Sequence, residues 1–354
     1  MPRILYAIQG TGNGHLSRAR DIVPLLQQRA DRVDVLVSGP PADLPLPFPV
    51  RYRRQGLGFI FGKKGGVDLA RTYLQLNSTR LLREIERLPV RDYDLVISDF
   101  EPVSAWACRL RGLPCVALSH QCAVLHPAAP APQREDYLGR AVLRHYAPAT
   151  AHYGFHFQSY APGISTPVIR RQVRELTPVN QGHYTVYLPA YAEEALVSRL
   201  RFLSRTLRWE VFSKHSSRPA RFGNVHVRPI SGDDFLLSLA SSAGVLCGAG
   251  FETPAEALFL GKKLLVVPMK NQFEQQCNAA ALAGLGVPVV ASLKDKHLPA
   301  LDAWLQHGRP LAVNYPDQTA GLLDQLLLEQ LPSGVRPIRH QLAAGPPPAY
   351  DASV

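Results

Sequence analysis

The chain has 354 residues, of which 46% are hydrophobic and 19% charged, enough for two domains that each bury a core. Its formal net charge of +11 indicates an anionic partner, such as nucleic acid, an acidic membrane surface or a phosphorylated small molecule. No arginine-rich run, zinc-finger spacing or aromatic RNA-binding motif occurs, so no nucleic acid is expected. Five cysteines without a CxxC pair argue against a disulfide framework.

The amino-terminal residues predict neither a secretory signal nor a membrane span. Only a short apolar run follows Met1, Pro2 and Arg3, and no stretch of about 18 apolar residues occurs. We therefore expect a cytoplasmic protein, and the positive charge is compatible with peripheral attachment to the inner face of the cell membrane. The segment 332–354 contains a proline-rich run and predicts a disordered tail.

Strand and helix patterns alternate along the first half of the chain. The expected order is a strand at 4–8, a glycine-rich turn at 10–15, a helix at 16–29, a strand at 33–37, a helix at 70–88, a strand at 94–97, a helix at 103–110 and a strand at 115–118. Strands that alternate with helices predict a parallel, doubly wound sheet.

A second cycle of strands and helices begins near residue 185. Its expected elements are strands at 185–188, 209–212, 225–227 and 244–246, with helices at 193–205 and 235–241. Turn signals between the cycles place a first domain at 1–170, a linker at 171–184 and a second domain at 185–331. The predicted fold class is α/β, with two Rossmann-like doubly wound parallel-sheet domains facing a central cleft.

A glycine-rich segment follows the first predicted strand and opens the first helix. Glycines let the backbone approach a ligand, and a helix start favours negative charge. The spacing G-x-G-x-G differs from the dinucleotide fingerprint, and no acidic residue ends the second strand, so a nicotinamide dehydrogenase is disfavoured. His15 at the end of this segment is a candidate general base, with helix orientation as the alternative role. The segment contains Gly10, Thr11, Gly12, Asn13, Gly14 and His15.

A second segment, residues 247–278, combines a Gly-x-Gly turn with the starts of two predicted helices. Free N–H groups at a helix start bind phosphate oxygens. Glu252 and Glu256 lie four residues apart on one helix face, where a carboxylate can accept both hydroxyls of a ribose. Gln272, Glu274, Gln275 and Gln276 are able to hydrogen-bond sugar hydroxyls, although an ordinary solvated helix face would have the same composition.

Polar residues also follow two strands of the first domain. Asp99 and Glu101 come after the strand at 94–97, and His120 comes after the strand at 115–118, where ligands of parallel sheets gather. Asp99 is a candidate second base or a partner that orients a histidine. The alternative role for Asp99 is to cap the helix that begins near Val103.

One loop of unusual composition sets apolar residues among glycines and follows them with two lysines. Such a loop suits a bilayer interface or an acceptor site, and a buried strand is the alternative. The residues concerned are Phe59, Ile60, Phe61, Lys63 and Lys64.

Elsewhere, the alternation of residue types around His152 and His156 favours a strand, so no metal site is expected there.

The two glycine-containing segments, in this order, resemble the GT-B nucleotide-sugar glycosyltransferases. The resemblance covers most of the chain and is nearest to a bacterial branch related to the peptidoglycan lipid-intermediate N-acetylglucosaminyltransferase. It rests on residues 10–15 with Ser17, Arg18 and Ala19, and on residues 250–278. What it implies is a GT-B architecture, with acceptor binding in the first domain and donor binding in the second.

The resemblance also implies roles for individual residues. Glu256 matches the glutamate that holds the donor ribose, Gln275 and Gln276 match the pair that contacts the donor sugar, and His15 matches a histidine near the acceptor. The expected donor-binding set is Gly248, Gly250, Phe251, Glu252, Thr253, Glu256, Gln272, Glu274, Gln275, Gln276 and Asn278. The expected acceptor-binding set is Gly12, Asn13, Gly14, Glu101 and His120, and the expected catalytic residues are His15 and Asp99.

One segment departs from the family pattern. Leu188-Pro189-Ala190-Tyr191 stands where relatives have a glycine- or serine-rich phosphate loop after the first strand of the second domain. The resemblance implies no cofactor and no metal, and a UDP-sugar is the first donor to test.

The expected activity is transfer of a hexose-type sugar from a nucleoside-diphosphate donor to an acceptor hydroxyl, with retention or inversion left open. A lipid-linked molecule or a cell-envelope glycan is the acceptor to test. A nucleotide-sugar 2-epimerase and a non-catalytic nucleotide-sugar-binding protein are the alternatives.

Overall fold

The computed structural model describes residues 2–11, 13–40, 45–57, 78–134, 136–214, 216–230 and 232–337. The first domain contains a seven-stranded sheet whose registered pairs are all parallel, in the order β3-β2-β1-β4-β5-β6-β7. Its strands are β1 (Arg3–Gln9), β2 (Arg32–Ser38), β3 (Tyr52–Arg54), β4 (Leu95–Asp99), β5 (Val116–Ser119), β6 (Ala151–Phe155) and β7 (Ile164–Ser165).

Helices cover both faces of this sheet, which is why its central strands are mostly apolar, with polar residues such as Gln9 and Asp99 only toward their carboxyl ends. In β1 every residue after Arg3 is buried, as expected for a parallel strand between two helical layers. The described helices of this part are α1 (Asn13–Gln27), α3 (Ser78–Glu86), α4 (Pro102–Leu110), α5 (His120–Val124), α6 (Tyr137–Tyr146) and α7 (Arg171–Arg174), with a short 3₁₀ turn at Val90–Asp92.

The second domain contains a six-stranded sheet in the order β10-β11-β9-β8-β12-β13, parallel except for the edge strand β10. Its strands are β8 (His183–Tyr187), β9 (Arg208–Ser213), β10 (Ala220–Phe222), β11 (Val225–Pro229), β12 (Gly244–Gly248) and β13 (Lys263–Val267). Its helices are α8 (Glu193–Leu203), α9 (Gly232–Ser241), α10 (Glu252–Phe259), α11 (Phe273–Gly284) and α12 (Leu298–His307), with a 3₁₀ turn at Asp295–His297.

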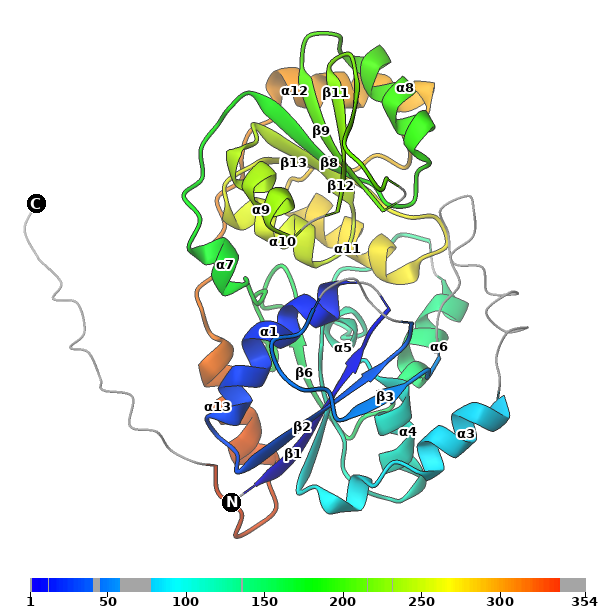
Figure 1. Cartoon of the computed structure of the whole chain (residues 1–354), viewed down its shortest axis with the longest axis vertical. Coiled ribbons are helices and arrows are strands. Elements are labelled where there is room, and N and C mark those ends of the chain that lie inside the picture. The colour runs from blue at the N-terminus through cyan, green and yellow to red at the C-terminus, as the bar shows by residue number, and fades with distance from the viewer. Residues whose placement is uncertain are drawn as a thin grey trace, which may run out of the picture.

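The last described helix, α13 (Thr319–Gln330), returns to the first domain and lies beside α1 (Figure 1). Its buried leucines belong to the same apolar cluster as Val23 and Leu26 of α1. Arg29 Nε donates to Asp324 Oδ1 at 2.7 Å, and the hydroxyl of Tyr153 donates to Glu329. The sequence-based boundary at 331 had grouped this helix with the second domain. An apolar helix face in the sequence does not indicate which domain the helix packs against, so the position of α13 is known only from the structure.

The start of α1 also differs from expectation. The helix begins at Asn13, so His15 lies in the first helical turn rather than in a loop before it. Since side chains three residues apart share a helix face, His15 and Arg18 project together toward the carboxyl ends of the strands.

The packing of α13 predicts a stability effect confined to one of its faces. Leu326→Ala removes a fully buried side chain and is expected to lower the free energy of unfolding by about 2–5 kcal/mol. The matched variant Leu328→Ala removes a side chain that is 62% exposed and is expected to change it by less than about 0.5 kcal/mol. Denaturant unfolding measures both, and hydrogen exchange should rise in α1 for Leu326→Ala. Faster exchange in α10 with α1 unchanged would contradict the placement of α13.

Candidate active site

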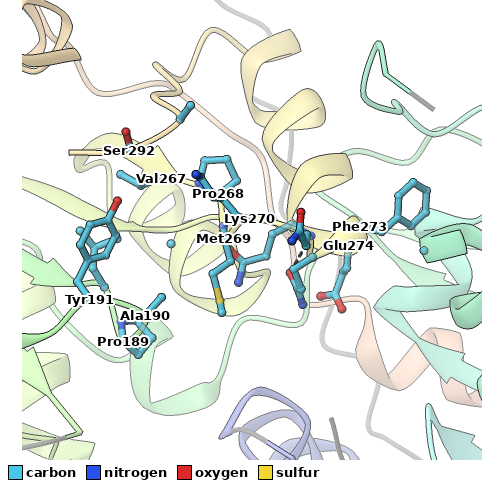
Figure 2. A pocket seen from close by; sticks show the side chains of 18 of the residues that line it. Pro189, Ala190, Tyr191, Val267, Pro268, Met269, Lys270, Phe273, Glu274 and Ser292 are labelled. Carbon is cyan, nitrogen blue, oxygen red and sulfur yellow. Dashed lines mark hydrogen bonds between the residues drawn. The ribbon is translucent and has the colours of Figure 1, made fainter. Parts of the chain in front are cut away.

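A cavity of about 1420 Å³ lies between the two domains, at the carboxyl ends of both sheets. Gln9, Phe100 and Gln121 line it from the first domain, at the ends of β1, β4 and β5. Figure 2 shows its second-domain wall, where Pro189, Ala190 and Tyr191 face the loop that carries Met269 and Lys270. The chain therefore places ligand-accessible groups of both domains around one space.

His15 lines this cavity, and its orientation is fixed by Asp99. The distance from His15 Nδ1 to Asp99 Oδ1 is 2.8 Å, and the Asp99 side chain is fully buried. Burial alone would lower the pKa of His15, but the charge and hydrogen bond of Asp99 outweigh it and raise the pKa above its usual value. With Nδ1–H donating to Asp99, the neutral imidazole keeps the lone pair on Nε2, the arrangement that a general base requires.

Arg18 holds Asp99 in its ionised form. Arg18 Nη2 lies 2.7 Å from Asp99 Oδ1 and 2.9 Å from Oδ2, and Nε lies 3.2 Å from Oδ2. Burial raises the pKa of Asp99, but the charges of Arg18 and His15 outweigh it and lower the pKa. Arg18 Nη2 also lies 3.1 Å from His15 Nδ1. A protonated Nδ1 cannot accept from it, so Asp99 is the hydrogen-bond partner of both groups.

The same guanidinium reaches the second domain. Arg18 Nη1 donates to Glu252 Oε1 at 2.8 Å, and Glu252 lies in the first turn of α10. Gly14 packs directly against the Glu252 carboxylate, where a Cβ atom would overlap its oxygens. The first turn of α1 is therefore joined to the first turn of α10 through one buried cation, and Gly14 is the residue that permits the approach.

Two further residues complete the surroundings of the His15 ring. Gln121 Nε2 lies 3.4 Å from His15 Nε2 and donates to Glu274 Oε2 at 3.1 Å, which links the ring to α11. Phe100 lies parallel to the His15 ring and stacks on Tyr146 with ring centroids 4.6 Å apart. Phe100 has φ of +55°, a strained value for a bulky residue, between Asp99 and Glu101.

The turn between β12 and α10 brings glycines and a helix start to the cavity. Gly248, Gly250 and Thr253 line the space, and Gly250 has nothing within 4 Å of where a Cβ atom would lie. The residue before α10, Phe251, forms no side-chain cap, so the first N–H groups of the helix keep no capping side chain. A helix start of this kind attracts phosphate.

The loop between β13 and α11 is held by two glutamines. Gln275 Oε1 accepts from Met269 N at 2.9 Å, and Gln276 Nε2 donates to Met269 O at 2.9 Å. Gln272 caps α11 by accepting from Gln275 N at 3.0 Å. Gln272, Gln275 and Glu274 line the cavity, whereas Gln276 does not. Gln272, Gln275 and Gln276 thus each use one side-chain amide atom in a hydrogen bond to the backbone, and the other amide atom forms no such bond.

Lys270 extends into the cavity from the same loop (Figure 2). Within the described part of the chain its ammonium forms no ion pair, and Asn271 beside it adopts φ of +56°. The segment Leu188-Pro189-Ala190-Tyr191 lies on the other side of the cavity from Lys270. It has one backbone hydrogen-bond donor fewer than a loop without proline, because Pro189 has no N–H. The Tyr191 hydroxyl accepts from Leu293 N at 3.2 Å and fixes the far wall.

Glu256 is placed differently from the sequence-based expectation. Its carboxylate is 2% exposed, does not line the cavity and accepts from Arg170 Nε at 2.5 Å and Nη2 at 2.7 Å. Glu252 and Glu256 lie on one face of α10 as predicted, but Glu252 pairs with Arg18 and Glu256 pairs with Arg170. Arg170 lies just before α7, about 86 positions away in sequence, which the local pattern cannot reveal.

Four more expected residues serve the interface between the domains or a helix cap. The ring nitrogens of His120 lie 2.7 Å from Phe155 O and from Asn278 Oδ1, and the ring stacks on Phe251 at 3.8 Å. Asn278 Nδ2 donates to Ala249 O at 3.0 Å. Glu101 is fully buried as the cap of α4 and accepts from Val103 N and Ser104 N. None of Glu101, His120, Phe251 and Asn278 lines the cavity.

Some expectations lie outside the described residues, namely Gly12 and the loop with Phe59, Ile60, Phe61, Lys63 and Lys64. Asn13 is described as the first residue of α1 and does not line the cavity. Within the described ranges no group of three His, Cys, Asp or Glu side chains is arranged to hold a metal ion. No described helix is both long and apolar enough to cross a membrane.

Five residues at the site were not expected from the sequence: Arg18, which contacts His15 and Asp99, and the cavity-lining residues Gln121, Phe100, Lys270 and Tyr191. For Arg18 a signal existed, since it follows His15 by three positions in a helix that starts at a glycine-rich turn. Gln121 follows His120 at a strand end and had the same positional signal.

The chain was compared with protein families and with solved structures. Residues 2–307 match a family model described as Glycosyl transferase family 1. No curated protein sequence is significantly similar to the chain.

Several solved structures share the arrangement of both domains. A UDP-glucosyltransferase from Polygonum tinctorium is 14% identical with a TM-score of 0.56, over 93% of this chain and 94% of that chain. UGT2 of Phytolacca americana, solved with UDP-2fluoro-glucose and pterostilbene, is 14% identical with a TM-score of 0.57 over the same shares. MurG of Acinetobacter baumannii is 16% identical with a TM-score of 0.53, over 93% of this chain and 100% of that chain. The predicted GT-B fold of two parallel-sheet domains is confirmed.

The His15–Asp99 contact predicts the titration of two histidines. In the wild-type protein the pKa of His15 is expected above 6.5, and Asp99→Asn is expected to bring it below 6.5, because burial remains after the carboxylate charge is gone. The pKa of His120, which burial lowers, serves as an internal reference and should not move. NMR titration of the imidazole resonances measures both. An unchanged His15 pKa in folded Asp99→Asn would contradict the assignment.

Proposed function

Because the chain belongs to glycosyl transferase family 1, we propose that it transfers a hexose-type sugar from a nucleoside-diphosphate donor to an acceptor hydroxyl. The observation that carries this proposal is the position of His15. Its Nδ1 is occupied by the buried Asp99, and its ring lines a cavity whose opposite wall begins at the uncapped start of α10. A base and an anion site thus face the same space from different domains.

The donor is proposed to place its diphosphate at the turn of Gly248 and Gly250 and at the start of α10. Backbone N–H groups there and the ammonium of Lys270 would stabilise the charge that develops on the leaving diphosphate. UDP is the first nucleotide to test, since two of the structural neighbours were solved with UDP or a UDP-sugar.

The reaction is proposed to begin when His15 Nε2 accepts the proton of the acceptor hydroxyl. The acceptor oxygen forms a bond to the anomeric carbon, the bond from that carbon to the phosphate oxygen breaks, and its electron pair leaves with the diphosphate. Asp99 stays ionised beside Arg18 and stabilises the imidazolium that forms.

The acceptor is proposed to carry an apolar portion. The cavity wall on the His15 side includes Phe100 together with Leu138, Val142 and Leu143 of α6, and Leu138 is 60% exposed. A wall of this composition favours a lipid-linked or otherwise apolar acceptor over a free sugar. Attachment at the inner face of a membrane would suit such an acceptor.

Replacing the proposed base is expected to affect turnover rather than donor binding. His15→Ala should lower the rate of sugar transfer about 10²–10⁴-fold, because the acceptor proton loses its acceptor. The dissociation constant of the nucleotide should change by less than about twofold, since His15 lies on the acceptor side. The control His126→Ala removes an imidazole outside the cavity lining. Steady-state assays of nucleotide release, with calorimetry for binding, measure both quantities.

Three outcomes would contradict the proposed reaction. Full turnover in His15→Ala would remove the histidine from the chemistry. Isomerisation of a labelled nucleotide sugar without any acceptor would instead support a 2-epimerase. Binding of a nucleotide sugar without turnover for any acceptor would support a binding protein.

Lys270 is expected to act on the diphosphate alone. Lys270→Met should weaken UDP binding about tenfold or more, because a charge-assisted hydrogen bond contributes about 1.5–3 kcal/mol. Uridine binding should stay unchanged. The difference in binding free energy between UDP and uridine therefore measures the contribution of Lys270 to diphosphate binding. Lys296→Met is the matched control, since Lys296 is exposed and lies outside the cavity lining. Equal losses for uridine and UDP would contradict a phosphate role for Lys270.

A further inference from the structure

The turn between β12 and α10, residues 248–251 and here called the glycine turn, presents alternate residues to two different surroundings. Gly248 and Gly250 line the cavity. Ala249 is fully buried, Phe251 is 4% exposed, and neither of them lines the cavity. The contacts of Ala249 and Phe251 therefore determine how the two glycines are presented to a ligand.

The ring of Phe251 lies among three rings of the first domain. It stacks on His120 with centroids 3.8 Å apart and an interplanar angle of 7°. The Phe157 centroid lies 5.1 Å from that of Phe251, and His156 approaches edge-on at 6.4 Å. His120, His156 and Phe157 are each at most 1% exposed. The glycine turn thus inserts one of its side chains into an aromatic socket of the other domain.

Two hydrogen-bonding contacts lead from His120 to the backbone of the same turn. His120 Nε2 lies 2.7 Å from Asn278 Oδ1, and Asn278 Nδ2 donates to Ala249 O at 3.0 Å. Asn278 is fully buried in α11. Because a carbonyl oxygen only accepts, the amide of Asn278 directs its nitrogen to Ala249 and its oxygen to His120. An imidazole N–H is the group that completes this chain.

The bond to Ala249 O orients a peptide plane at the edge of the cavity. In a trans peptide the C=O and the following N–H point in opposite directions. With Ala249 O held toward Asn278, the N–H of Gly250 points away from Asn278. In the part of the chain that the structure describes, this N–H donates to no backbone carbonyl. Glycine permits the plane to rotate, so the bond to Ala249 O is what fixes the direction of the N–H.

His120 has two acceptors but a single proton to share between them. Its Nδ1 lies 2.7 Å from Phe155 O within the first domain, and its Nε2 lies 2.7 Å from Asn278 Oδ1 across the interface. Burial lowers the pKa of His120, so near neutral pH the ring carries one N–H. Donation from Nε2 joins the two domains, whereas donation from Nδ1 leaves Asn278 Oδ1 without a donor.

We propose that His120 is a positioning residue for the diphosphate of the donor. By donating Nε2–H to Asn278 it holds Ala249 O in place and directs the N–H of Gly250 toward a phosphate oxygen. His120 lies outside the cavity lining, so it acts on the donor site from the acceptor domain without touching substrate. The inference rests on the proposed function, because it takes the ligand of the glycine turn to be a nucleoside diphosphate.

The matched variants His120→Gln and His120→Asn test this role. Both remove the ring, but the amide nitrogen of Gln is as many bonds from Cβ as Nε2 is, whereas that of Asn corresponds to Nδ1. UDP, TDP, GDP and ADP are first compared on the wild-type chain by calorimetry, and the tightest ligand becomes the probe. His120→Asn is expected to bind the probe about tenfold more weakly than His120→Gln, because the preorganisation of one phosphate donor is lost. The nucleoside without phosphate should bind both variants equally.

The tautomer of His120 gives a second readout, which a role in packing alone would not move. The nitrogen chemical shifts of isotope-labelled wild-type protein distinguish Nε2–H from Nδ1–H. In the complex with the probe, His120 is expected to carry its proton on Nε2. A ring that carries its proton on Nδ1 in that complex overturns the proposal.

His183 provides the control for loss of a buried histidine. It is 3% exposed, its Nε2 lies 3.1 Å from Ser238 O, and it lies outside the cavity lining. His183→Gln and His183→Asn should bind the probe equally, and thermal unfolding checks that every variant is folded. A His120 pair that differs no more than the His183 pair, or an equal loss for probe and nucleoside in His120→Asn, overturns this inference alone. Binding of none of the nucleoside diphosphates to the wild-type chain overturns it together with the proposed donor.

Discussion

The buried guanidinium of Arg18 is the interaction on which the rest of the site depends. It is 2% exposed and lies between two carboxylates, Asp99 of the first domain and Glu252 of the second. A buried cation is costly unless its partners are in place, so this group favours the arrangement in which both domains meet. Because Asp99 also orients His15, the geometry of the base and the approach of α10 are set by one side chain.

This coupling gives the fold a chemical consequence. Closure of a two-domain cleft excludes water from the reacting atoms and limits hydrolysis of the donor. Here the closing contacts include polar groups next to the cavity, namely Arg18 with Glu252 and Gln121 with Glu274. Both contacts lie beside His15, so the approach of the two domains brings the base and the start of α10 to the same cavity.

The sequence predicted the central strands because parallel strands buried on both faces are largely apolar runs, as in β1 and β12, whereas the short edge strands β3, β7 and β10 were not predicted. Of the residues singled out at strand ends, His15, Gly248 and Gly250 line the cavity. The sequence-based prediction failed where the outcome depends on a distant partner. The pairing of Glu256 with Arg170, the use of Gln275 on the Met269 backbone, and the return of α13 to the first domain are long-range choices that local spacing does not encode.

The pH dependence of sugar transfer tests the central claim most directly, because it reports the ionisation of the base during turnover. His15 must be neutral to accept a proton, and its pKa is raised by Asp99, so kcat/KM should fall as pH falls through a value above 6.5. In Asp99→Asn the plateau should drop and the acid limb should move to lower pH, because the group that raised the pKa is gone. An acid limb at the same pH in both proteins would contradict the account.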